Sequence, residues 1–231
     1  MSQENFDSYP YLAPGRRPIA WVTWLIVGST VAVFLLQLLF LHLYGGGVND
    51  IVGNTLAFGP QAWADGRYWT LITYAWAHAV IMFDDPGLFW LHIAANMIFL
   101  ACLGPAVEEF LGPWRFLGLY LGGALAAALV WFFFNPNTDG IIGASGAVFA
   151  VVAGAGTAAP RARIILYLFY FLPIRMNMGT MALVCCGLEA AQAFFGWMPG
   201  IAHSAHLGGA AFGFLYVLAV RLMARNRYLS N

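Results

Sequence analysis

The chain has 231 residues, of which 61% are hydrophobic and only 9% are charged, and its formal net charge is zero. A soluble domain carries about 25% charged residues, and a water-soluble fold of this length could not bury so much apolar surface. The composition therefore predicts an integral membrane protein, and the zero net charge argues against nucleic acid as a partner.

Six stretches are apolar enough to cross a bilayer, which requires about 20 residues of helix. In chain order they cover residues 19–43, 88–106, 114–134, 143–159, 177–196 and 202–222. The fourth is short because Pro160 cannot continue a helix. Residues 1–18 and 226–231 are expected to be short tails, and residues 19–225 are predicted to form one all-α integral membrane domain.

The arginines predict how these spans are oriented. Nine fall on one side of the membrane if the six spans alternate in direction: Arg16, Arg17, Arg115, Arg161, Arg163, Arg175, Arg221, Arg225 and Arg227. Only Arg67 falls on the other side. Positive charge accumulates on the cytoplasmic side, so both termini are predicted to be cytoplasmic. Segment 44–87 is then an external loop, whose Trp and Tyr residues suit short helices at the membrane surface.

Polar side chains inside the predicted spans are costly in a bilayer and are therefore functional candidates. His92 and Asn96 in the second span are four residues apart and share a helix face. The fourth span carries Ser145 and the sixth carries His206. His92, Ser145 and His206 each lie about four residues past the outer end of their span, which is roughly 6 Å below the outer boundary. We therefore expect these side chains to share one layer.

This layer has the groups that nucleophilic catalysis needs. A serine requires a neighbouring base at neutral pH, so Ser145 is the expected nucleophile and His206 the expected general base. His92, the Asn96 amide and the Ser145 backbone N–H could hold the oxyanion. No carboxylate is expected at this depth, since Asp139 precedes the fourth span. The polar residues of this layer therefore predict a Ser–His dyad and not a triad.

Small residues predict how the fourth and sixth spans pack. A face of Ala and Gly follows Gly146 in the fourth span, and a GxxxG pair follows His206 on the same face of the sixth, namely Gly209 and Gly213. Such pairs let two helix backbones approach closely, which would bring His206 to Ser145. The fourth span starts late, at Gly143, and leaves room above the serine for a water-filled cavity.

Three motifs then resemble the signature of a known family. They are GASG at 143–146, AHLGGAAFG at 205–213 and HIAAN at 92–96, which are similar to GxSG, AHxxGxxxG and HxxxN. With these motifs in order on correctly oriented spans, residues 20–225 resemble the rhomboid family of intramembrane serine proteases. The segment AVEEFLG at 106–112 is similar to the family's turn after its second helix.

The resemblance implies a bundle of six transmembrane helices in which Ser145 and His206 are catalytic and His92 and Asn96 contribute to the oxyanion site. It also implies transmembrane protein substrates, cut near an unstable helix end, with water as the second reactant and no cofactor or metal. Phe149 stands where an aromatic ring stacks on the histidine. The family's Trp-Arg pair is replaced by Trp69-Thr70, so no arginine is expected to anchor the external loop.

Three other polar residues have simpler expected roles. His203 lies shallower than His206 and is expected to be interfacial, and His78 is expected to be a loop or span-end residue. Glu189 in the fifth span is either a hydrogen-bonded helix residue or a lining of the substrate gate, and the sequence leaves both open. The absence of lysine and the Ala, Gly and Arg richness suggest a bacterial inner membrane, with the active site opening to the external or periplasmic side.

Two other classes of function remain as alternatives. A transporter or channel could use the histidines as a proton or metal path, but the spans show no repeated halves and transport gives Ser145 no role. A non-catalytic rhomboid-like protein that binds membrane proteins is the other alternative. A zinc protease would require HExxH, which the sequence lacks.

Overall fold

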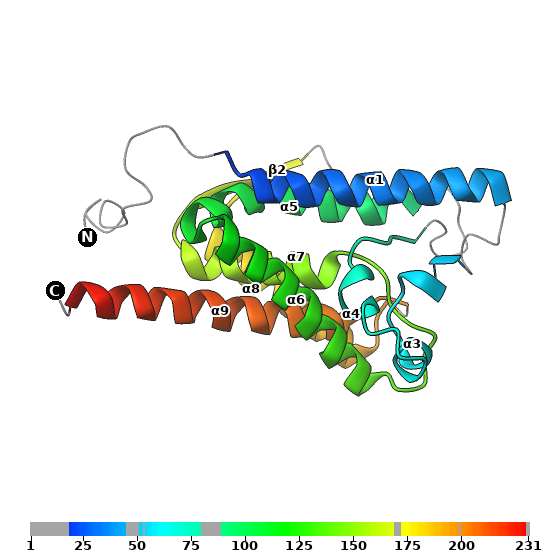
Figure 1. Ribbon diagram of the computed structural model, residues 1–231. Coiled ribbons are helices and arrows are strands. Elements are labelled where there is room, and N and C mark those ends of the chain that lie inside the picture. Colours follow the sequence, from blue (N-terminus) through cyan, green and yellow to red (C-terminus); the bar gives the residue numbers. More distant parts are fainter. Residues whose placement is uncertain are drawn as a thin grey trace.

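The computed structural model describes residues 19–44, 51–52, 54–79, 89–168, 172–198 and 200–229, and it is mostly helical. The expected tail 1–18, with Arg16 and Arg17, lies outside the described residues. In chain order the elements are α1 (Trp21–Tyr44), α3 (Pro60–Ala64), α4 (Thr70–Thr73), α5 (Phe89–Leu111), α6 (Pro113–Phe134), α7 (Ser145–Ala158), β1 (Arg163–Leu168), β2 (Leu172–Asn177), α8 (Met178–Phe195) and α9 (His203–Leu229) (Figure 1).

Five of the described helices are long and apolar enough to cross a membrane, namely α1, α5, α6, α8 and α9. The remaining predicted span, the fourth, corresponds to α7, which is apolar but has only 14 residues. It ends at Ala158, immediately before the position at which Pro160 was expected to stop it. The start of α1 and the end of α9 lie at the same end of the bundle, and α3 and α4 lie at the other (Figure 1).

The expectation of an all-α chain is wrong between α7 and α8. There β1 and β2 form an antiparallel two-stranded sheet, in a register that runs from Arg163 opposite Asn177 to Leu168 opposite Leu172. The segment after Pro160 contains Ile164, Ile165 and Tyr167, which are residue types that favour strands. With α7 stopped and α8 not yet begun, pairing the two arms of the hairpin satisfies their backbone hydrogen bonds.

Two helices extend beyond their predicted spans. The second predicted span was to end at residue 106 in a turn, but α5 continues through Pro105 to Leu111. The turn is a single residue, Gly112, whose φ of 80° suits glycine. The last helix, predicted to end at 222, continues to Leu229 and includes part of the expected tail 226–231.

Glu108, near the end of α5, caps the first turn of α1. Its carboxylate accepts hydrogen bonds from the backbone N–H groups of Val22 at 3.1 Å and Thr23 at 2.8 Å, and from the Thr23 hydroxyl at 2.7 Å. The first N–H groups of a helix have no intrahelical acceptor, and a negative charge there is favourable. This buried carboxylate therefore ties α1 to α5.

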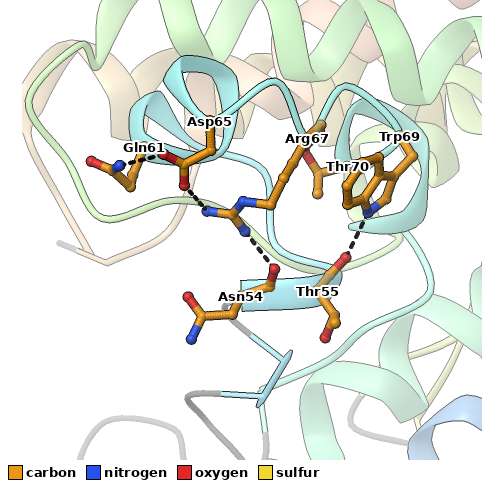
Figure 2. A network of polar contacts seen from close by, with 7 residues as sticks. All are labelled: Asn54, Thr55, Gln61, Asp65, Arg67, Trp69 and Thr70. Carbon is orange, nitrogen blue, oxygen red and sulfur yellow. Dashed lines mark hydrogen bonds and ion pairs between the residues drawn. The ribbon is translucent and has the colours of Figure 1, made fainter.

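The loop between α1 and α5 is held by contacts around Arg67 (Figure 2). The guanidinium donates to the Asn54 carbonyl at 2.6 Å and to the Asp65 carboxylate at 3.1 Å. The Trp69 indole N–H donates to the Thr55 carbonyl at 3.0 Å. The expectation that no arginine anchors this loop is therefore wrong, because the chain reverses after α3 and brings Arg67 back against the segment before it.

Helix α7 lies at the centre of the bundle, and nine of its residues, from Gly146 to Ala155 with Phe149 excepted, are buried. It packs against α9 backbone to backbone. A Cβ added to Gly209 would collide with the carbonyl oxygen of Gly146, and one added to Gly213 would collide with that of Ala150. The predicted close packing of these two small-residue faces is confirmed.

Candidate active site

Ser145 and His206 lie in contact, as the packing of α7 on α9 predicts. Ser145 is the first residue of α7, and His206 lies in the first turn of α9. The His206 Nε2 atom is 2.7 Å from the Ser145 hydroxyl oxygen. The Phe149 ring stacks on the imidazole, with 4.7 Å between centroids and 14° between planes. One turn of α7 therefore supplies both the hydroxyl and a support for the ring that contacts it.

A cavity of about 720 Å³ opens onto this pair. Residues of four helices line it, including His92 and Asn96 of α5, Ser145 and Phe149 of α7, Cys185 of α8 and His206 of α9. The cavity brings the four polar candidates of the predicted layer to one space. Its volume leaves room for water beside the serine.

His92 and Asn96 hold the entry to α7. Gly143 has a φ of 120°, and a Cβ there would lie 2.8 Å from the His92 ring, so the ring packs directly on the backbone before Ser145. Only glycine combines this φ with this approach. The Asn96 amide donates to the His92 carbonyl at 2.9 Å. Both side chains reach the serine's surroundings, and no direct hydrogen bond joins them to its hydroxyl in the described structure.

His78 was expected to be a loop or span-end residue, and it does lie in the loop after α4, where its side chain is fully buried. Its Nε2 atom lies 3.4 Å from both the Ala144 backbone nitrogen and the Asn96 amide nitrogen. Burial, and next the nearby His92, lower the pKa of His78 to about 3, so its neutral ring can accept the Ala144 N–H. No sequence motif singled this residue out, because its role depends on a fold-level contact between the loop and α7.

Gln37 of α1 fixes His78 in place. The Gln37 amide donates to the His78 carbonyl at 2.8 Å, and its oxygen accepts the His78 N–H at 3.0 Å. The glutamine side chain therefore pairs with the loop as a neighbouring strand would. A polar residue in the middle of an apolar span is costly, and Gln37 is the sequence signal that could have pointed to a buried partner in this loop.

Glu189 corrects a further expectation, that no carboxylate reaches this depth. Its Oε2 atom lies 2.8 Å from Nδ1 of His206 and 2.7 Å from Nδ1 of His203. In a helix that runs inward, depth is counted from its first residue, whereas α8 runs outward and its depth is counted from its last residue. Counted back from Phe195, at the end of α8, Glu189 is about 9 Å along the helix, a level comparable to that of His206.

One group of residues within the described ranges has the composition and spacing to hold a metal ion. It consists of Glu189, His203 and His206, whose ligand atoms lie within 4.8 Å of one another. Two histidines and a glutamate are a ligand set that zinc accepts. However, with bonds of about 2.0–2.1 Å, two ligand atoms of a tetrahedral zinc stand roughly 3.3 Å apart. The nitrogen–oxygen contacts here, at 2.7 and 2.8 Å, are those of groups sharing protons.

Comparison with known proteins agrees with these features. A sequence model described as the Rhomboid domain matches residues 65–222, which include Ser145, His206, His92 and Asn96. The chain belongs to the rhomboid family. The predicted resemblance is thereby confirmed, and the apolar helices are those of a multi-pass integral membrane protein.

Rhomboid proteins from distant organisms are similar to this chain. Presenilin-associated rhomboid-like protein A, mitochondrial, of Danio rerio is 32% identical over 130 residues, 55% of this chain and 33% of that protein. Rhomboid protease GluP of Bacillus subtilis is 28% identical over 195 residues, 83% of this chain and 34% of the relative. RHOMBOID-like protein 12, mitochondrial, of Arabidopsis thaliana is 33% identical over 175 residues, 68% of this chain and 48% of the relative. The matched region thus spans between a third and a half of the length of these rhomboid relatives.

Proposed function

We propose that this rhomboid-family protein is an intramembrane serine endopeptidase that hydrolyses peptide bonds in or near the transmembrane segments of membrane proteins. The observation that carries the proposal is the 2.7 Å contact between Ser145 and His206 at the wall of a cavity of about 720 Å³. A serine needs such a base to become a nucleophile at neutral pH. Membership of a family whose relatives include a named rhomboid protease supports the same chemistry.

In this mechanism His206 moves a proton twice. Its Nε2 atom takes the proton of the Ser145 hydroxyl as the oxygen attacks the substrate carbonyl, and then gives that proton to the leaving amine. A water molecule from the cavity, deprotonated by His206, then attacks the acyl-enzyme, and as the ester bond breaks His206 returns that proton to the Ser145 oxygen, which releases the acid and regenerates the serine. The chain's own residues suffice for these steps, so we propose no cofactor and no metal.

The oxyanion of the tetrahedral intermediate needs donors at the same place. The Ser145 backbone N–H belongs to the first turn of α7, whose N–H groups have no intrahelical acceptor. We propose that this N–H, the Asn96 amide and the His92 ring stabilise the oxyanion. The position of His92 against Gly143, with Asn96 donating to the His92 carbonyl, supports this assignment.

The proposed topology has six membrane-spanning helices, with α7 as the short fourth span and both termini cytoplasmic. The start of α1 and the end of α9 lie at one end of the bundle, and α3 and α4 lie at the other (Figure 1). This arrangement supports the proposed orientation. The cavity would then open toward the external side. We propose the bacterial inner membrane as the location, with transmembrane proteins as substrates, the lipid bilayer as surroundings and no nucleic acid as partner.

The test is cleavage of a model transmembrane substrate by the purified protein in detergent or liposomes. Ser145→Ala and His206→Ala should each abolish cleavage while the protein keeps its wild-type melting temperature. A fluorophosphonate should label Ser145 in the wild type alone. Unimpaired cleavage by Ser145→Ala would exclude the mechanism. Absence of both cleavage and labelling in the wild type would instead favour a non-catalytic or transport role for the same fold.

A further inference from the structure

The Glu189 carboxylate joins two histidines behind the site. Its Oε2 atom lies 2.7 Å from His203 Nδ1 and 2.8 Å from His206 Nδ1. All three side chains are largely enclosed, with 14% of the Glu189 side chain and 10% of each imidazole exposed. They come from α8 and the first turn of α9, and none of the proposed chemical steps so far uses Glu189 or His203.

The position of each proton follows from the hydrogen-bond partners. If His206 Nε2 accepts the serine proton, the neutral ring carries its hydrogen on Nδ1, which faces Glu189. His203 Nε2 lies 3.0 Å from the Trp197 carbonyl, which only accepts, so this nitrogen carries a hydrogen. His203 Nδ1 and Glu189 then share one further proton between them. The pair Glu189–His203 is neutral overall wherever that proton lies.

We propose that Glu189 is a positioning residue for His206, with His203 as its counter-charge. The carboxylate holds His206 in the tautomer whose Nε2 lone pair faces Ser145, and it stabilises the imidazolium formed during attack. It takes no proton from His206. His203 offsets the charge of Glu189 inside the bundle, where an unpaired carboxylate is costly. This inference rests on the proposed protease function and extends the dyad to three residues, with Glu189 as the group that orients His206.

The contact between His206 and Glu189 is close but not well directed. The distance is 2.8 Å, yet the Nδ1 atom of His206 forms no hydrogen bond of good angle among the described residues. Catalytic hydrogen bonds are often poorly aligned without substrate and tighten when it binds. We therefore expect the effect of Glu189 on the rate to exceed its effect on substrate affinity.

The experiment compares the wild type with Glu189→Gln, which removes the charge but keeps the shape, and Glu189→Ala, which removes both. Gln192→Ala serves as the matched control, since Gln192 lies one turn further along α8 and its side chain forms no hydrogen bond within the described ranges. Three quantities are measured for each: the melting temperature, kcat and KM with a transmembrane substrate, and the rate at which a small fluorophosphonate labels Ser145.

We expect both Glu189 variants to lose kcat by about 10²-fold, within the range of general base catalysis, with KM changed less than about threefold. Labelling of Ser145 should slow in parallel, because the small reagent needs an activated serine but no substrate gate. Gln192→Ala should match the wild type. A further variant, His203→Gln, should lose less than the Glu189 variants, since it disturbs the carboxylate without removing it.

Two results would overturn the inference. If the Glu189 variants label at the wild-type rate but cleave poorly, with KM raised, Glu189 lines the substrate gate. If they cleave and label as the wild type does, Glu189 has only a packing role. In both cases the wild type remains an active protease, so the proposed function stands. Failure of the proposed function is a different result, namely a wild type that neither cleaves nor labels.

Discussion

The ring of Phe149 lies nearly parallel to the imidazole of His206, and both side chains face the same cavity. The two residues come from different helices, so the stack is a tertiary contact that restricts rotation of the histidine about its side-chain bonds. We expect Phe149→Ala to lower kcat about tenfold, because an imidazole free to rotate spends less time at hydrogen-bond distance from Ser145.

Phe149→Tyr is the control for this stack, since it keeps the aromatic ring and should retain most of the activity. Phe149→Leu separates ring stacking from simple filling of space. The measurements are kcat and KM for a transmembrane substrate. Equal activity in the alanine variant and the wild type would mean that α9 alone orients His206.

The contact of α7 with α9 predicts a sharp difference between two glycines. A Cβ at Gly209 would strike the Gly146 carbonyl, whereas a Cβ at Gly187 in α8 would meet nothing within 4 Å. Gly209→Ala should therefore force the helices apart, with a cost of about 1–3 kcal/mol or more, and lengthen the distance from Ser145 to His206. Gly187→Ala should be neutral or slightly stabilising.

Melting temperature and cleavage rate in detergent check this pair of variants. For Gly209→Ala alone, we expect the cleavage rate to fall by more than the decrease in the amount of folded protein explains. If both alanine variants behave alike, the approach of the two backbones does not control the spacing of the site.

His78 predicts how the stability of the protein changes with pH. Its pKa in the fold is about 3, below the ordinary histidine value of about 6.5, so between these values the unfolded chain binds more protons than the folded one. Stability should therefore rise with pH across this window and fall on acidification, by up to about 1.4 kcal/mol per pH unit from this residue.

The measurement is melting temperature against pH from 4 to 7 for the wild type and His78→Gln. Glutamine can still offer an oxygen to the Ala144 N–H but does not titrate. The variant should be less stable at pH 7 and show a shallower decline toward acid, whereas parallel curves for the two proteins would contradict the prediction.

Glu108 predicts that the connection between α1 and α5 depends on a negative charge. Glu108→Gln turns an acceptor of three donors into an amide whose nitrogen cannot accept, and it should cost about 1.5–3 kcal/mol of stability. Thr23→Val removes one of these donors and should cost about 1 kcal/mol. Both losses are read from melting temperature, and a larger loss in Thr23→Val than in Glu108→Gln would argue against the cap.

Some residues of the site could be predicted from the sequence, because the depth of each in the membrane follows from its place within its own span. His92, Ser145 and His206 could be placed in one layer by counting along three inward-running helices, and the glycines of α9 indicated which face meets α7. Each of these inferences uses only local periodicity and the thickness of a membrane.

The site residues whose roles could not be predicted from the sequence depend on contacts between distant parts of the chain. His78 reaches α7 from a loop whose path is set by Gln37 of α1 and by the contacts of Arg67. Glu189 lies on a helix of opposite direction, so its level depends on where α8 ends and not on where it begins. The hairpin of β1 and β2 was missed because a strand pair between two membrane helices has no periodicity of its own in so apolar a sequence.

The glycine contact of α7 with α9 has a consequence for how this protein can vary. The separation of the serine and the histidine is governed by main-chain atoms of two helices that touch without intervening side chains. Side chains on the outside of the bundle, such as Phe133, Leu183 and Phe194, are largely exposed and take no part in that spacing. Their size and shape can therefore drift with the thickness and composition of the surrounding lipid, provided that they stay apolar, while the reacting groups keep their distance.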